Sequence, residues 1–86
     1  MDCYLAMPTV LRLNGFDVCV YTHDHPPGHV HVLKAGAEVV INLGDAETSP
    51  SMREVKGMSK KDARQAVTLV EDHRDALLAE WRGIHG

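Results

Sequence analysis

The dipeptide Asn14-Gly15 constrains the fold of this chain more than any other feature of its sequence. Asn-Gly is the preferred pair for a two-residue β-hairpin turn, because both turn positions need a positive φ angle. Residues 9–13 before it are rich in strand-forming side chains, and residues 16–22 after it alternate between apolar and polar side chains. The sequence therefore predicts two antiparallel strands joined by a tight turn.

Two further strands are predicted downstream. Residues 30–33 and 38–43 are rich in valine, isoleucine and leucine, and Ala35-Gly36 separates them as a second tight turn. Residues 52–56 would add a short edge strand as a fifth. Strands joined by such short turns pair with their neighbours in sequence, so we expect an antiparallel β-meander of four or five strands.

A helix is predicted for the last third of the chain. Ser59 is a good N-cap, and Asp62 three residues later completes a capping box. Apolar side chains then recur at helical spacing, at Ala63, Ala66, Val67, Val70, Leu77 and Trp81. Gly83 is expected to end the helix. The predicted fold class is therefore α+β, an antiparallel β-meander of four or five strands packed by one long C-terminal α-helix.

The length of the chain limits it to one hydrophobic core. A chain of 86 residues builds a single domain, and its first six residues look like a short appendage. We therefore expect residues 1–6 to be an N-terminal appendage and residues 7–86 to be a single α+β domain. The apolar runs are too short to span a bilayer, so no membrane partner is expected.

Charge and cysteine content narrow the environment and the partners. The formal net charge of −3 gives no broad basic field, so it does not favour nonspecific binding of nucleic acid. The local exception is a basic cluster, which is either a solvated surface or a phosphate-contacting patch: Arg53, Lys56, Lys60, Lys61 and Arg64. Cys3 and Cys19 do not suggest a disulfide scaffold, so we expect reduced thiols and a cytoplasmic protein.

The chemically richest stretch holds four histidines within nine residues, His23, His25, His29 and His31. If the strands on either side of Pro26-Pro27-Gly28 pair with His25 opposite His29, then His23 lies opposite His31. In that register all four imidazoles share the sheet face away from the helix, while the valines face the helix. We therefore expect an exposed histidine face.

Three interpretations of this face stay open. The first is acid–base catalysis, in which two close imidazoles act as base and acid in metal-independent cleavage of RNA. The cation that this chemistry needs would be Lys34, Arg12 or the basic cluster. The second is a metal site in which His25, His29 and His31 bind zinc or another transition metal. The third is a His-Pro loop that serves as an interaction surface and needs no cofactor.

Several stretches together resemble a family of small bacterial proteins, domain-of-unknown-function family 4160. The matching residues are Met7-Pro8-Thr9-Val10, Tyr21, Asp24-His25-Pro26-Pro27 with His29 and His31, Glu71-Asp72-His73-Arg74, and Trp81. The Asp-His-Pro-Pro-x-His-x-His run is the specific part of this resemblance. Gly28 stands where the family often has a third proline or a histidine.

The resemblance implies a compact α+β protein encoded beside another small protein, in an arrangement similar to toxin–antitoxin pairs. The expected partner is therefore a small cognate protein from a neighbouring gene. The expected assembly is a heterodimer with that protein or a homodimer of this chain. The resemblance also gives Asp24, His25, His29 and His31 the best claim to be catalytic positions. His25 and His29 would share the acid and base roles, Asp24 would orient one of them, and His31 would assist. We expect a cytoplasmic component of a bacterial two-gene or defence module.

Overall fold

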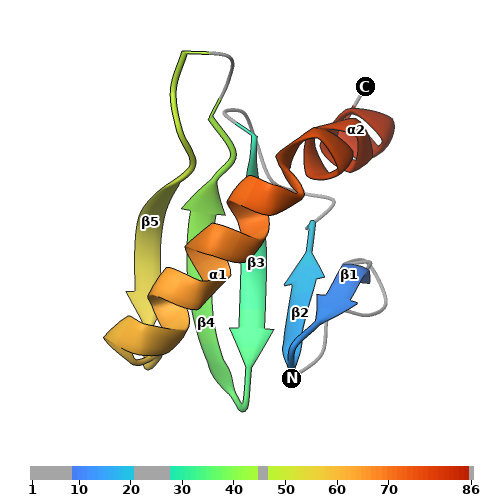
Figure 1. Ribbon diagram of the computed structural model, residues 1–86. Coiled ribbons are helices and arrows are strands. Elements are labelled where there is room, and N and C mark those ends of the chain that lie inside the picture. Colours follow the sequence, from blue (N-terminus) through green and yellow to red (C-terminus); the bar gives the residue numbers. More distant parts are fainter. Residues whose placement is uncertain (1–8, 21–27, 45–46, 86) are drawn as a thin grey trace.

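The computed structural model describes residues 9–20, 28–44 and 47–85. The strands are β1 (Thr9–Leu13), β2 (Phe16–Cys19), β3 (His29–Lys34), β4 (Ala37–Asn42) and β5 (Ser51–Lys56), and the helices are α1 (Lys60–Asp72) and α2 (Arg74–His85). The five strands pair in sequence order into one antiparallel sheet, and the helices follow (Figure 1). The predicted α+β meander is confirmed, with its fifth strand. The predicted appendage, residues 1–6, lies outside the described residues.

Two hairpin turns organise the sheet. Asn14 and Gly15 join β1 to β2 with φ angles of 54° and 82°, and Ala35 and Gly36 join β3 to β4 with φ angles of 50° and 84°. Both positions of each turn are left-handed, a geometry that matches the right-handed twist of the strands it joins. Asparagine tolerates this conformation, whereas the Cβ of Ala35 makes it unfavourable by about 1–2 kcal/mol.

The register between β3 and β4 agrees with the prediction. Val30 lies opposite Ile41, and Val32 lies opposite Val39. Because side chains alternate along each strand, these four residues share one face of the sheet.

The register between β2 and β3 differs from the prediction. His31 lies opposite Cys19 and not opposite His23, which is a shift of four residues. The strand predicted over residues 16–22 is shorter than expected, since β2 ends at Cys19. A shift by an even number of residues leaves every side chain on its predicted face, so the division of the faces survives the error.

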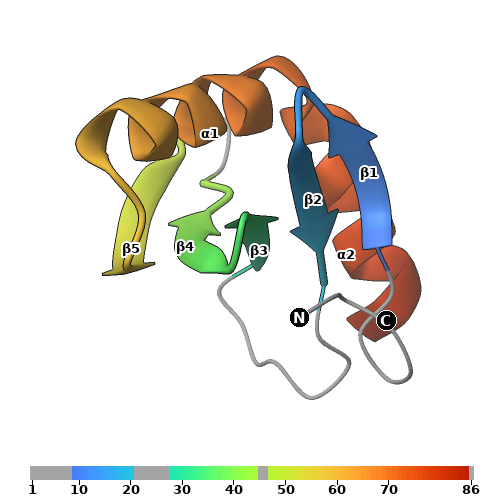
Figure 2. The same cartoon turned by 90° about the horizontal axis from the view of Figure 1, so that it is seen from below.

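The hydrophobic core lies between the sheet and α1, on the side that we call the α1 face (Figure 2). The buried side chains of the core are Phe16, Val18, Val30, Val32, Val39 and Ile41 from the strands, Val20, Leu43 and Met58 from connecting segments, Ala63, Ala66, Leu69 and Val70 from α1, and Leu77 and Trp81 from α2. The helix begins as predicted, because the amide of Asp62 donates to Oγ of Ser59 at 3.1 Å. The valine-rich strands and the apolar stripe of the helix therefore cover each other.

The C-terminal segment is two helices, so the prediction of one long helix is wrong. His73 has φ −116° and ψ 17°, which ends α1, and its ring Nδ1 donates to the carbonyl of Leu69 at 2.9 Å. Periodicity did not reveal this break, because one non-helical residue barely shifts the apolar stripe. Figure 2 shows α2 turning away from the α1 layer. The predicted stop at Gly83 is also wrong, since α2 runs to His85. Neither helix in the described part of the chain is long and apolar enough to cross a membrane.

Cys19 is disulfide-bonded in the structure, so the expectation of reduced thiols is wrong. The expectation rested on the number of cysteines, which contains no distance. A disulfide requires only that the Cα atoms of two cysteines come within about 4.4–6.8 Å of each other.

Candidate functional site

Two of the candidate histidines lie on the sheet face away from α1, which we call the second face. His31 on β3 lies between Cys19 on β2 and Val40 on β4, and His29 lies opposite Asn42. Alternation along β3 places both histidines on this face because Val30, between them, points to the core. The predicted division of the two faces therefore holds for the described histidines.

These two histidines are buried, so the expectation of an exposed histidine face is wrong for them. Their exposed fractions are 4% for His29 and 8% for His31. The indole ring of Trp81 on α2 contributes to this burial, with its centroid 5.2 Å from that of the His29 ring. The sequence argument assumed that the helix covers one face only, whereas Trp81, on α2 after the break at His73, belongs to the core cluster and also contacts the His29 ring.

His31 is oriented by a carboxylate. Its ring Nδ1 lies 2.7 Å from Oε2 of Glu38 on β4, and both side chains are largely shielded from solvent. A carboxylate accepts hydrogen bonds, so Nδ1 of His31 carries the proton of this bond. The other ring nitrogen is then Nε2, without a proton in the neutral ring, and Glu38 fixes the direction in which it points. This is the arrangement by which a carboxylate prepares an imidazole to act as a base.

His29 is held by a cation. Nη1 of Arg53 on β5 lies 3.2 Å from Nδ1 of His29. A guanidinium only donates hydrogen bonds, so Nδ1 of His29 accepts, and the ring carries its proton on Nε2. Val40 on β4 pairs with Glu54, and the next residue, Ile41, pairs with Met52. Arg53, between Met52 and Glu54, is therefore the extra residue of a β-bulge. Bulges re-aim side chains, and this one directs Arg53 toward the histidines.

The two imidazoles are close enough to act on one small group. Their ring centroids are 5.4 Å apart, in an edge-to-face arrangement. Lys56 adds a second cation, with Nζ 4.0 Å from Oε1 of Glu38. Oδ1 of Asn42, opposite His29, is the buried side-chain atom of the described chain that has no hydrogen-bond partner. An unsatisfied buried acceptor costs about 1–3 kcal/mol, so a ligand hydroxyl there would relieve it.

The remaining predicted residues divide as follows. His23, Asp24 and His25 lie outside the described residues. Of the candidate cations, Lys34 lies on the α1 face, over the ring of Phe16 and 3.4 Å from Oδ1 of Asp62. Arg12 pairs with Asp17 at the other edge of the sheet.

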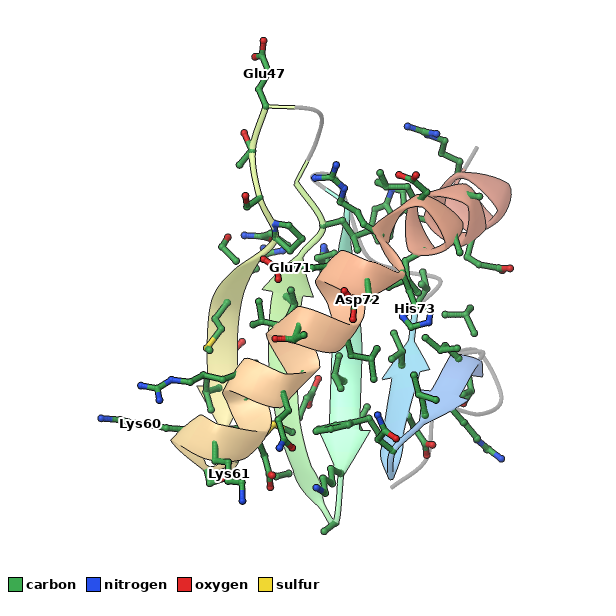
Figure 3. All side chains as sticks on the ribbon, viewed as in Figure 1. Glu47, Lys60, Lys61, Glu71, Asp72 and His73 are labelled. Carbon is green, nitrogen blue, oxygen red and sulfur yellow. The ribbon has the colours of Figure 1, made fainter. Side chains whose placement is uncertain are left out.

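The basic cluster splits between the two sides of the sheet. Arg53 and Lys56 reach the second face, where each lies beside a site residue. Figure 3 shows Lys60 and Lys61 pointing outward from the first turn of α1, far from Glu71 and Asp72 at its other end. Arg64 is also exposed on α1. The predicted patch is therefore two sets of cations, and only one of them belongs to the site.

Sequence reasoning missed Glu38, Asn42 and the contact of Trp81 with His29, and it named Arg53 only as one of the five cations of the basic cluster. The predicted register between β3 and β4 already places Glu38 on the same face as His31. Glu38 could therefore have been predicted as a neighbour of His31. Which cation of the cluster reaches His29 could not be predicted, because the position of Arg53 depends on the bulge. Among the described residues no three side chains of the histidine, cysteine, aspartate or glutamate type form a group that fits a metal ion. The metal interpretation required His25, so it is untested.

These features define a small α+β protein with an apolar face under a helix and a buried polar cluster on the other face. The chain belongs to the family described as Domain of unknown function (DUF4160), whose model matches residues 15–82. The match spans all the described site residues, and it supports the resemblance drawn from the sequence. No curated protein and no solved structure gives a significant match.

Proposed function

We propose that the second face is a metal-independent acid–base site that cleaves RNA phosphodiester bonds. The observation that carries this proposal is the hydrogen bond of 2.7 Å between Nδ1 of His31 and Oε2 of Glu38. A carboxylate that holds one ring nitrogen prepares the other to take up a proton. Arg53 supplies the positive charge that a phosphoryl transition state needs, and it does so beside the second imidazole.

In this proposal His31 is the general base. Its Nε2 accepts the proton of a ribose 2′-hydroxyl, and the 2′ oxygen attacks the adjacent phosphorus. Arg53 and the Nε2–H of His29 stabilise the additional negative charge on the phosphorus oxygens. The bond from phosphorus to the 5′ oxygen breaks, the 5′ oxygen takes a proton from water, and protonated His31 gives its proton to the hydroxide that is left, so a 2′,3′-cyclic phosphate and neutral His31 remain. This division of roles differs from the sequence-based one, in which His31 only assisted.

The test uses the untagged protein with EDTA present, and RNA and DNA oligonucleotides of the same sequence. We expect RNA fragments with 2′,3′-cyclic phosphate ends and intact DNA, because DNA lacks the 2′-hydroxyl. His31→Gln should slow cleavage by about 10²–10⁴-fold, the usual contribution of a general base. Cleavage at the wild-type rate in His31→Gln would exclude this assignment.

A pair of arginine variants tests the role of the cation. Arg53→Gln should slow cleavage strongly, since its guanidinium contacts His29. Arg12→Gln is the matched control, because Arg12 is 69% exposed and pairs with Asp17 at the opposite edge of the sheet. Equal rates in the two variants would show that Arg53 has no special role.

We also propose that the chain works as a component of a bacterial two-gene, toxin–antitoxin-like module and binds the small protein of the neighbouring gene. The resemblance drawn from the sequence implies this pairing, and a groove between the β1–β2 hairpin and α1 offers a docking surface separate from the second face. Leu13, Phe16 and Leu69 contribute to this groove, and Leu13 is 38% exposed. The two proteins should co-purify, and Leu13→Asp should abolish co-purification without changing RNA cleavage. Independent migration of the two wild-type proteins would contradict this part of the proposal.

The competing function is a transition-metal site at His25, His29 and His31. The contact of Arg53 with Nδ1 of His29 counts against it, because a guanidinium beside a ligand repels a metal cation. Calorimetric titration of the untagged protein with zinc distinguishes the two functions. Stoichiometric binding that disappears in His29→Gln would favour the metal site.

A cytoplasmic location is a further part of the proposal, and Cys19 tests it. The cytosol keeps thiols reduced, whereas disulfides persist in oxidising compartments. Because Cys19 is fully buried, the cells are lysed directly into denaturant with the alkylating reagent; in a cytoplasmic protein Cys19 should then be alkylated without added reductant, although the structure holds it in a disulfide. Protection of Cys19 until reductant is added would contradict that location.

A further inference from the structure

The edge strand β5 presents an unusual surface to solvent. All six of its residues are exposed, whereas β1, at the other edge, is half-buried over three of its five residues. Met52 and Val55 are 43% and 45% exposed, although both are large apolar side chains. An exposed edge that carries apolar side chains is a template for pairing with another strand.

The bulge at Arg53 gives β5 a two-fold pattern. Met52 and Val55 are three residues apart and would lie on opposite faces of a regular strand. Their strand partners Ile41 and Val39 are both core residues of the α1 face, so the bulge has brought Met52 and Val55 to the same face. If β5 pairs with an antiparallel copy of itself about the bulge, Met52 of each copy lies opposite Val55 of the other.

The charges of β5 fit the same symmetry. In this register Arg53 of each copy lies opposite Glu54 of the other, so both pairs have opposite charges. Glu54 now lies 3.8 Å from Lys56, in an ion pair whose side chains are both more than half exposed. Such exposed pairs contribute about 0–1 kcal/mol, so Glu54 can exchange one partner for another at little cost. Charged side chains usually protect an edge, but these are placed to attract a second copy.

We propose that β5 pairs with β5 of a second copy of this chain, so that two sheets join into one across a two-fold axis at the bulge. The guanidinium of Arg53 has five donors, so it can bind Glu54 of the second copy while it contacts His29. The other edge does not offer this pattern. An antiparallel self-pairing of β1 about Leu11 would place Val10 opposite Arg12 and Thr9 opposite Leu13, so no opposite charges would meet between the copies.

Sedimentation velocity over a wide range of protein concentration tests this proposal. We expect a reversible monomer–dimer equilibrium, and a weak one, because a single pair of short strands buries less than a standard interface. Glu54→Arg and Arg53→Glu each place like charges opposite at two positions. Each change should weaken the dimer by about tenfold in Kd. The matched controls are Glu47→Arg and Lys61→Glu, which make the same charge changes at side chains that point away from the sheet (Figure 3).

Mixing the two variants gives the decisive measurement. A chain with Glu54→Arg and a chain with Arg53→Glu are complementary, so an equimolar mixture should form a heterodimer that native mass spectrometry detects as one copy of each. Circular dichroism of each variant alone establishes that it folds. A wild-type protein that is monomeric at the highest concentration, a dimer insensitive to both changes, or a mixture that associates no better than its components would each overturn the proposal.

Discussion

The two faces of the sheet are made from the same strands and are buried by different means. On the α1 face, Val30, Val32, Val39 and Ile41 are fully buried under a helix. On the second face, alternate residues of β3 are also buried, but they are histidines held by Glu38 and Arg53. Burial of an apolar side chain stabilises a protein by about 1.5–3 kcal/mol. Burial of a polar group gains little even when the group is hydrogen-bonded.

This difference shows where stability and chemistry reside in the molecule. The α1 face needs only side chains that are apolar and of suitable volume. The second face holds two imidazoles, a carboxylate and a guanidinium, each with a defined donor or acceptor, and leucines or valines at the same positions would fold at least as well. We infer that the α1 face stabilises the fold and that the residues of the second face are explained by their chemistry.

The largest effect is expected from truncation of the α1 face. Ile41→Ala removes a fully buried core side chain, and we expect a loss of about 2–5 kcal/mol in the free energy of unfolding measured in urea. Its neighbour Val40 is also buried, at 4% exposure, but points to the second face, outside the core cluster. Val40→Ala should therefore cost less, about 1–2 kcal/mol. Equal losses would mean that the two faces contribute equally to stability.

The second effect is expected when one member of the polar pair is removed. Glu38→Leu leaves the buried His31 without the carboxylate at 2.7 Å, so we expect a loss of about 1–3 kcal/mol. Glu54→Leu is the matched control, because Glu54 is exposed on the neighbouring strand. That change should stay within about 0.5 kcal/mol of the wild type. Equal stability of the two variants would mean that the hydrogen bond to His31 is not formed in solution.

Much of the fold could be predicted from local signals in the sequence. The pair Asn14-Gly15 and the valine-rich segments specify turns and strands within a few residues of one another. The N-cap at Ser59 is equally local. The break at His73 could not be predicted, because periodicity survives a single non-helical residue. The predicted register between β2 and β3 is wrong by four residues, because it treats Pro26-Pro27-Gly28 as a tight turn and a Pro-Pro-Gly sequence does not fix the length of the connection.

The candidate site was predictable only in part, for the same reason. Alternation along β3 was enough to place His29 and His31 on one face. The burial of His29 depends in part on Trp81, which is 50 residues after His31 and lies on α2, beyond the break at His73. Arg53 depends on a bulge, which the sequence does not reveal. Tertiary contacts of this kind decide which charge meets which imidazole.

A smaller effect is expected in the turns, away from both faces. Ala35 and Asn14 occupy the same position of two equivalent turns, with φ angles of 50° and 54°. Ala35→Asn should stabilise the protein by about 0.5–1 kcal/mol, since asparagine tolerates this conformation better than alanine. RNA cleavage should not change, because the turn touches neither imidazole. The reciprocal Asn14→Ala should destabilise the protein by a similar amount, and the same sign for both changes would contradict the argument.

The smallest effect on stability is expected from the change that should affect activity most. The double variant His31→Leu with Glu38→Leu removes the buried pair completely, so no polar group is left unsatisfied. Replacing both partners by apolar side chains of similar size is often close to neutral, and we expect the free energy of unfolding to stay within about 1 kcal/mol of the wild type. The double variant should thus be more stable than Glu38→Leu alone and inactive toward RNA. If its loss in stability equals the sum of the two single losses, the pair belongs to the scaffold, and the distinction between a stabilising face and a chemical face fails.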